Sequence, residues 1–455
     1  MLEAFENIMT KINDLIWGLP MIILLFGTHI YLTFRTGFVQ KYIFKGIKLS
    51  LNKEVDVEGE ISPFQALTTA LASTIGTGNI IGVSTAIVSG GPGAVFWTWM
   101  TGIFGIATKY VETFIAVKYR KKQADGTYVG GAMTALEHLN LKWLGVFFAI
   151  ITALASLGIG CGVQSNAISD ILQKNYNLSP YLIGAVLSIS TILVILGGVK
   201  SIAKVCQMLV PVMSFMYIAG CIYILIYNCR VLPETIELII KSAFTPSALA
   251  GGFAGSTMMV AARYGIARGL FSNESGLGSS PIVSASSSSR NAVKTALIGA
   301  TGTFWDTVVV CAITGLVLVS SVISNPNIST IGLEGGELST LCFAQIPYIG
   351  TPLLIFGVIT FAFSTILGWC VYAEKCLAYM YGKEILKYYR LLWSVVVFLG
   401  AVVNLSLIWK ISDALNALMV IPNLVAMLLL VKIVAKDTKY YLSENHLDEY
   451  DTSLE

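Results

Sequence analysis

The chain has 455 residues, 55% of them hydrophobic and only 12% charged, with a net charge of +3 and a mean hydropathy of +0.75. A typical globular protein carries about 25% charged residues, so this composition indicates an integral membrane protein. The small and dispersed net charge also argues against a nucleic-acid partner.

Eleven stretches are long and apolar enough to cross a bilayer as helices, which takes about 20 residues. They lie near residues 18–38, 64–89, 93–117, 143–172, 180–199, 202–228, 250–282, 291–322, 348–382, 389–409 and 411–435. Residues 1–17 form a mildly amphipathic N-terminus. Residues 436–455 form a tail that we expect to be cytoplasmic, and its charged part, Asp437 to Glu455, is expected to be disordered.

Lysine and arginine predict the orientation of the chain, because short cytoplasmic loops are enriched in both. If the N-terminus lies outside, most of the 29 lysines and arginines fall on the inside, with clusters at 35–53 and 118–122. An odd number of spans then places the C-terminus in the cytoplasm. We therefore expect a multi-pass protein of the cell membrane.

Two spans contain runs of glycine and polar residues that weaken a helix. In span 64–89 the run is Gly-Thr-Gly-Asn at 76–79, and in span 250–282 it extends from Gly269 to Gly278. Unwound backbone at membrane depth is tolerated only where it is buried in protein or lines a wet cavity. Paired discontinuous helices indicate the binding site of a secondary transporter, although each run alone also fits close helix packing.

The order of the spans predicts two repeats. One extra helix, 18–38, precedes five spans in 64–228 and five in 250–435, and each broken helix comes first in its group. An odd number of spans per group makes the two groups run through the membrane in opposite directions, as in inverted-repeat transporters. The expected fold class is therefore an all-α integral membrane protein of eleven helices, two of them discontinuous.

Two runs resemble the strong sequence blocks of the alanine or glycine:cation symporter family. They are GGPGAVFWTW at 90–99, continuing to Gly105, and the run from Gly269 to Gly278. One departure is Thr98, where methionine is more usual. The resemblance implies sodium-coupled import of small neutral amino acids, alanine or glycine, by alternating access. It also implies the fold of bacterial leucine transporters with one added N-terminal helix.

An amino acid that leaves water must have both of its charges met, because an unpaired buried charge is costly. The helix restarting after the first run offers free N–H groups, so Thr77 and Gly78 are predicted to bind the carboxylate. Carbonyls near Phe271 and Ser272 are predicted to hold the ammonium group. The predicted substrate-binding residues are Ile75, Gly76, Thr77, Gly78, Gln164, Met259, Phe271, Ser272, Asn273 and Trp369.

Sodium coupling needs oxygen ligands without a proton donor. Asn79 offers an amide oxygen and Thr74 a carbonyl, which predicts one sodium site beside the substrate carboxylate. The resemblance implies a second site at the adjacent hydroxyls of Ser364 and Thr365, which also fit bonds back to their own helix. The predicted sodium ligands are Ala72, Thr74, Ile75, Asn79, Ser364 and Thr365.

Acidic residues inside spans leave a second function open. Asp306 fits a proton relay, an ion ligand or a hydrogen-bonded structural acid. Glu112 lies three residues after Lys109, so the two are predicted to pair on one helix face. A proton-coupled amino-acid transporter that uses Asp306 or Glu112 is the nearest alternative.

Two arginines in the seventh span, Arg263 and Arg268, are harder to interpret. They fit a gate salt bridge with Glu274, or they indicate that part of this span is an extracellular or re-entrant piece. Channels also place polar breaks in helical bundles, but the five-plus-five order of spans favours a transporter.

Enzyme functions find no support in the sequence. The three histidines lack metal-ligand spacing, the eight cysteines form no CxxC, and no Walker sequence is present. No acid or base is evident for binding a charged side chain in the predicted pocket. We expect no cofactor other than sodium as the coupling ion.

Overall fold

A computed structural model describes residues 9–13, 16–52, 59–245, 253, 257–333, 335–403, 406–443 and 446–451. Its elements are α2 (Leu19–Arg35), η1 (Val39–Tyr42), α3 (Ile43–Ser50), α4 (Pro63–Thr74), η2 (Gly78–Gly82), α5 (Val83–Gly90), α6 (Gly93–Lys118), β1 (Lys121–Lys122), β2 (Tyr128–Val129), α7 (Ala132–His138), α8 (Lys142–Ala155), η3 (Ser156–Gly162), α9 (Val163–Tyr176), α10 (Pro180–Ile195), α11 (Gly198–Tyr227), η4 (Cys229–Val231), α12 (Leu232–Phe244), α13 (Met258–Asn273), α14 (Pro281–Ser284), α15 (Ala292–Thr303), η5 (Phe304–Cys311), α16 (Ala312–Ser324), α17 (Glu337–Phe343), α18 (Gly350–Tyr381), α19 (Leu386–Val402), α20 (Ser406–Leu442) and η6 (His446–Asp448).

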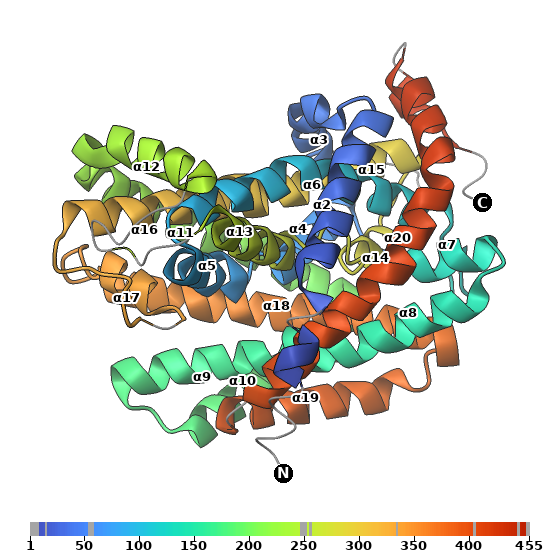
Figure 1. Ribbon diagram of the computed structural model, residues 1–455. Helices are drawn as coiled ribbons and strands as arrows, with labels where there is room; N and C mark the ends of the chain where they lie inside the picture. Colours follow the sequence, from blue (N-terminus) through green and yellow to red (C-terminus); the bar gives the residue numbers. More distant parts are fainter. Residues whose placement is uncertain are drawn as a thin grey trace.

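These elements form a bundle in which long apolar helices pack side by side, with α18 against α8, α9 and α11 (Figure 1). Helices lie in every one of the eleven predicted spans, so the helical membrane class is confirmed. Residues 250–252, 254–256 and 404–405 of those spans lie outside the described residues. Among the described residues, five continuous helices are long and apolar enough to cross a membrane, and the number is seven if each of two bent helix pairs is counted as one span. The count of eleven and the repeat arrangement remain predictions.

The first predicted break is confirmed between α4 and η2. Ser62 caps α4 in a capping box with Gln65, each side chain bonding the other's backbone N–H, which fixes where the helix begins. The helix ends at Thr74, and Ile75 leaves helical geometry with a ψ of 87°. The chain resumes helical form at Gly78 with its axis bent by 50°.

The second break is also confirmed and is longer. Helix α13 ends at Asn273, and Glu274 adopts the left-handed conformation with a φ of 54°. Gly276 and Gly278 follow at φ values of 97° and 76°, which glycine adopts without strain. Residues 274–280 are non-helical until the short helix α14 begins at Pro281.

Three π-helical turns lie in the helices around the breaks. They are η2 in the first broken helix, η3 between α8 and α9, and η5 between α15 and α16. A π turn inserts one residue into a helix and is frequent at functional sites. Because η2 packs against η5 and η3 packs against α18, these turns surround the place where the breaks meet.

The two chain ends frame the bundle. The N-terminal helix α2 packs on α6, and the chain bends by 69° between it and the segment η1–α3. At the other end, α20 continues to Leu442, and residues 446–451 fold back onto α6 and α15. There Lys118 pairs with Asp451 at 2.6 Å and Lys294 with Asp448 at 2.9 Å. The predicted disorder of the tail was therefore wrong for residues 437–443 and 446–451. We call the end of the bundle at which residues 446–451 lie the tail side, and the opposite end of the bundle the far side.

Candidate functional site

The two breaks meet in the interior of the bundle. A β-carbon built on Gly78 would lie 3.5 Å from the Phe271 ring and 3.6 Å from the Cα atom of Ser272. A cavity of about 20 Å³ lies between the breaks, which is room for about one water molecule. It is lined by Ser73, Thr74, Gly76, Thr77, Gly78, Ile159, Gln164, Phe271, Ser272, Glu274, Leu277, Thr365, Trp369 and Asn416.

The cavity collects most of the predicted substrate-binding residues but not all of them. Those that line it are Gly76, Thr77, Gly78, Gln164, Phe271, Ser272 and Trp369. Ile75 is buried and lines a different cavity, and Asn273 turns its amide oxygen to the backbone N–H of Ser275 at 2.9 Å. Met259 lies in the first turn of α13 with 63% of its surface exposed, so the structure does not bring it to the cavity.

Gln164 joins its own helix to the first break. Its side-chain oxygen accepts a hydrogen bond from the Thr77 hydroxyl at 3.1 Å, and its amide donates to the Ile159 carbonyl in η3 at 3.1 Å. On the same wall Trp369 packs so closely on Gly160 that a β-carbon there would collide with it. The space beside Gln164 is therefore fixed in size by a glycine in η3.

Asn79 links the first break to Asp306 in η5. Its side-chain oxygen accepts from the Gly76 N–H at 2.9 Å, and its amide donates to the Asp306 carboxylate at 2.7 Å. Asp306 also accepts from the Ser272 hydroxyl at 2.9 Å. The carboxylate therefore bonds to both broken helices, although the amide oxygen of Asn79 is engaged by Gly76.

The predicted second sodium group converges on the carbonyl of Ala72. The hydroxyls of Ser364 and Thr365 lie 3.0 and 3.2 Å from that oxygen. Both hydroxyls also lie 2.9 Å from the Phe361 carbonyl of their own helix, so the cross-helix contact and the back-bond occur together. A β-carbon on Gly76 would come within 2.6 Å of the Thr365 hydroxyl, so a glycine keeps this space open. Thr74 directs its own hydroxyl to the Ala70 carbonyl at 3.1 Å.

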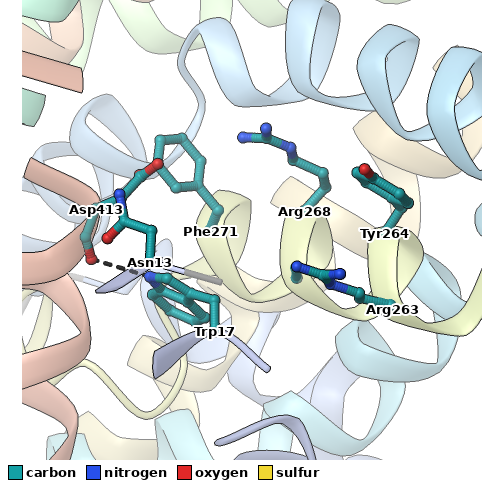
Figure 2. A pocket seen from close by; sticks show the side chains of 8 residues that line it. Asn13, Trp17, Arg263, Tyr264, Arg268, Phe271 and Asp413 are labelled. Atoms are coloured by element: carbon teal, nitrogen blue, oxygen red, sulfur yellow. Dashed lines mark hydrogen bonds between the residues drawn. The ribbon is translucent and has the colours of Figure 1, made fainter. Parts of the chain in front are cut away.

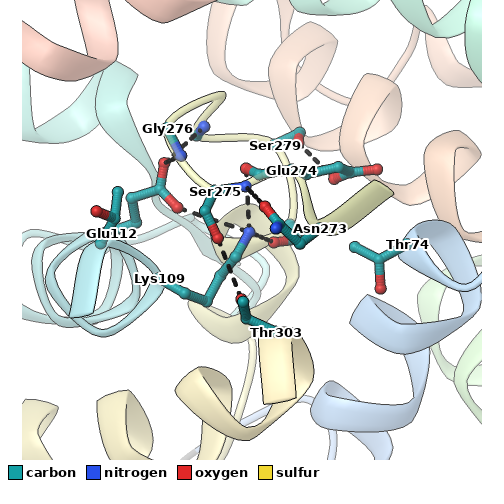
Figure 3. A network of polar contacts seen from close by, with 12 residues as sticks. Thr74, Lys109, Glu112, Asn273, Glu274, Ser275, Gly276, Ser279 and Thr303 are labelled. Atoms are coloured by element: carbon teal, nitrogen blue, oxygen red, sulfur yellow. Dashed lines mark hydrogen bonds and ion pairs between the residues drawn. The ribbon is translucent and has the colours of Figure 1, made fainter. Parts of the chain in front are cut away.

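A charged network holds the unwound loop of the second break (Figure 3). Glu112 accepts from the N–H groups of Gly276 and Gly278 at 2.8 and 3.0 Å and from the Asn423 amide at 2.6 Å. Lys109 lies 3.6 Å from Glu112, as predicted for this pair. Its ammonium group also donates to the backbone carbonyl of Glu274 at 3.1 Å.

Two polar lining residues were missed or misread from the sequence. Glu274 lines the cavity and is 3% exposed, so the expectation that the pocket holds no acid was wrong. Asn416 of α20 also lines this cavity and is 2% exposed. No local signal marks Asn416, whereas the position of an acid inside the predicted break from Gly269 to Gly278 was a signal for Glu274.

A second cavity of about 140 Å³ lies on the far side of Phe271 (Figure 2). Arg263 and Arg268 line it from α13, and Asp413 lines it from α20. Trp17 closes over it and donates to the Asp413 carbonyl at 2.9 Å. Phe271 lines both cavities and therefore forms the wall between them. Arg268 lies 5.9 Å from that ring.

The tail side of the central cavity is closed by several polar contacts. Lys375 pairs with Glu60 at 2.5 Å and donates to the Tyr128 carbonyl at 2.7 Å. Arg120 donates to the Ser287 carbonyl at 2.8 Å. In the part of the chain that the structure describes, Phe271 is the side chain that the central cavity shares with the cavity toward the far side, whereas a buried ion pair and hydrogen bonds lie toward the tail side.

Comparisons with known proteins agree along the whole chain. A sequence model of the sodium:alanine symporter family matches residues 2–453. An uncharacterized transporter of Haemophilus influenzae is 43% identical over 98% of both chains. The sodium/alanine symporter AgcS of Methanococcus maripaludis is 44% identical over 96% of this chain and 97% of that protein. Among solved structures, MhsT in complex with L-phenylalanine shares the fold, with a TM-score of 0.61 and 16% identity over 87% of this chain and 96% of that one.

Proposed function

Because the chain belongs to the sodium:alanine symporter family, a family of secondary transporters rather than enzymes, we propose that it imports alanine or glycine together with sodium by alternating access. The observation that carries the proposal is the meeting of two broken helices at one closed cavity. Broken helices expose N–H groups at one end and carbonyls at the other, so they offer both signs of charge to a zwitterion and its ion.

The substrate carboxylate is placed at Thr77 and Gly78. The N–H groups at the start of a helix have no partner within it and carry the positive end of its dipole. The narrow wall formed by Trp369 on Gly160 supports a small side chain. Since the cavity has room for about one water molecule, its lining must move apart when the substrate binds.

Sodium is placed between Ala72, Ser364 and Thr365. When each hydroxyl donates its proton to the Phe361 carbonyl, its lone pairs remain available, together with the Ala72 carbonyl, for a cation. The other predicted sodium site, at Asn79 and Thr74, can use the second lone pair of the Asn79 amide oxygen, because the Gly76 N–H occupies only one. The nearby Asp306 carboxylate supplies negative charge that favours a cation there.

Alternating access follows from the two unequal barriers around the cavity. Movement of Phe271 would open it to the far side, and separation of the Lys375–Glu60 pair would open it to the tail side. The predicted orientation places the tail side in the cytoplasm. Entry of sodium is then favoured by about 2.3 kcal/mol per charge per 100 mV of inside-negative potential. Coupling requires sodium and substrate to increase each other's affinity by the same factor.

Uptake of radiolabelled alanine into proteoliposomes tests this function. Replacing sodium by choline or potassium should abolish saturable uptake, and unlabelled glycine should compete. Thr365→Ala should raise the sodium concentration for half-maximal uptake at least tenfold, and Asn79→Ala should lose sodium stimulation while both proteins fold. Thr360→Ala is the matched control, because Thr360 bonds back to its own helix at Phe356 and Gly357. Normal sodium dependence in both Thr365→Ala and Asn79→Ala would refute the assigned ion sites.

Asp306 supports proton coupling as a second candidate, since a buried carboxylate bonded to both breaks could carry a proton across. Uptake driven by a pH gradient without sodium, and lost in Asp306→Asn, would favour this function. Sodium-dependent uptake that is indifferent to the pH gradient would exclude it.

A further inference from the structure

A set of hydrogen-bond acceptors in the cavity has no role in the contacts above. Glu274 lies in the second break, and its carboxylate accepts from the Ser279 hydroxyl at 2.5 Å. The side-chain oxygen of Asn416 is buried and has no hydrogen-bond partner among the described residues. Both residues line the same cavity as Thr77 and Gly78. Figure 3 shows the Glu274 side chain directed toward Thr74 at the end of α4.

The surroundings of Glu274 are negative. Helices α4 and α13 both end at this cavity, so each directs its end carbonyls and the negative end of its dipole toward it. A buried carboxylate among acceptors is costly unless a cation or a proton compensates it. The cavity therefore has a place for a cation.

Lys109 does not fill this place. Its ammonium group bonds the backbone carbonyl of Glu274 and the Ser280 hydroxyl, at 3.1 and 2.5 Å, and pairs with Glu112. Lys109 thus lies near the carboxylates of both Glu112 and Glu274, but its donors are directed away from the Glu274 carboxylate. Lys109, Glu112 and Glu274 together carry one net formal negative charge, and the nearby Asp306 adds another.

We propose that Glu274 and Asn416 bind the α-ammonium group of the transported amino acid. An ammonium group has three donors, and the Glu274 carboxylate, the Asn416 oxygen and an end carbonyl of α13 supply three acceptors. The carboxylate of the same zwitterion then reaches the N–H groups at Thr77 and Gly78, which line the same cavity. This inference rests on the proposed function and extends it from the broken backbone to two side chains.

A sodium ion is a poorer occupant of this place. Sodium already has an oxygen group at Ala72, Ser364 and Thr365, and a further sodium beside Glu274 would leave the substrate ammonium without an opposite charge. With the ammonium at Glu274, each buried carboxylate of the cluster has a cation: Lys109 serves Glu112, and the substrate serves Glu274.

The test compares L-alanine with L-lactate, which carries a hydroxyl in place of the ammonium group. In the wild type, L-alanine should compete for labelled alanine uptake at least 100-fold better than L-lactate. Glu274→Gln should raise KM for alanine about 100-fold and reduce the preference for alanine over lactate to below tenfold, because a neutral amide no longer selects a cation. Sodium should still raise the melting temperature of the purified variant. Glu137→Gln, an acid in an ion pair on the protein surface, is the control and should change neither quantity.

Asn416→Ala provides an independent reading and should lower the alanine preference about tenfold with sodium stabilisation intact. If Glu274→Gln fails to fold, the Asn416→Ala variant is the test of the proposal. A general loss of structure would weaken the binding of alanine and of lactate equally and would leave the preference unchanged. An unchanged preference in a folded Glu274→Gln, or in Asn416→Ala when Glu274→Gln does not fold, would overturn the inference. So would a Glu274→Gln protein that keeps its alanine KM and loses only its dependence on pH, since that marks a proton site. Wild-type protein without sodium-dependent amino-acid uptake would instead refute the proposed function.

Discussion

The unwound backbone groups of the two helix breaks find their hydrogen-bond partners in different ways. The first interrupts the helix for only a few residues around Ile75, and its exposed Gly76 N–H is satisfied three residues later by Asn79 of the same helix. The second unwinds residues 274–280 and depends on side chains from other helices, Glu112 on α6 and Asn423 on α20. The first break is therefore supported partly within its own helix, with further bonds to Gln164 and Asp306, whereas the backbone of the second break relies more on side chains of other helices.

The largest expected effect comes from removing the external support of the second break. Glu112→Leu leaves the N–H groups of Gly276 and Gly278 unpaired and Lys109 without its counter-charge. Breaking a buried pair in this way costs about 3–5 kcal/mol. Thermal unfolding in detergent should show the loss, and Glu137→Leu, which removes a partly exposed pair with Lys121, should cost about 1 kcal/mol or less. Equal stability of the two variants would show that the loop holds itself.

A pair of glycine substitutions sharpens the comparison. Gly278→Ala should destabilise the protein by about 1–3 kcal/mol, because its φ of 76° is strained for alanine and the new methyl group would lie 2.7 Å from Asn423. Gly78→Ala meets only ordinary contacts and should leave the melting temperature unchanged. It should instead reduce the uptake of alanine more than that of glycine, because its methyl group occupies the cavity. If Gly78→Ala instead lowered the melting temperature and left the uptake of alanine and glycine equally affected, backbone conformation rather than space would be the reason for glycine at the first break.

Glycine and polar runs made both breaks predictable, because they act on the local backbone. The pairing of Ser364 and Thr365 with Ala72 also agrees with what the family resemblance implied. Met259 was misplaced because it lies twelve residues before Phe271 on one continuous helix, about 18 Å away at the rise of an α-helix. Asn416 could not be found, because its role depends on how α20 crosses the breaks, which no local pattern encodes.

The tail was misread for a similar reason. A charged composition indicates a solvated segment, but Leu447 is buried and its carbonyl accepts from Asn291 at 2.9 Å. The partners of this segment are more than 150 residues away in the sequence. Composition alone carries no information about such distant contacts.

The smallest expected effect is at the point where this tail touches α15, the first long helix after the second break. Lys294 lowers the pKa of Asp448, so the pair contributes stability at neutral pH that is lost as pH falls through that lowered pKa. The Asp448 side chain is 78% exposed, so Asp448→Asn should cost about 0–1 kcal/mol. Melting temperatures measured from neutral to acid pH should converge for wild type and variant, and a gap that widens in acid would contradict the pair's role.

The single ring that divides the two cavities has a kinetic consequence. Side chains reorient far faster than packed helices part, in nanoseconds against microseconds to milliseconds. A solute entering from the far side would therefore bind and escape many times before the ion-paired layer opened once. Loading would reach rapid equilibrium, and the slow inward step alone would set the turnover rate, so substrates of unequal affinity would converge on one maximal velocity at saturation.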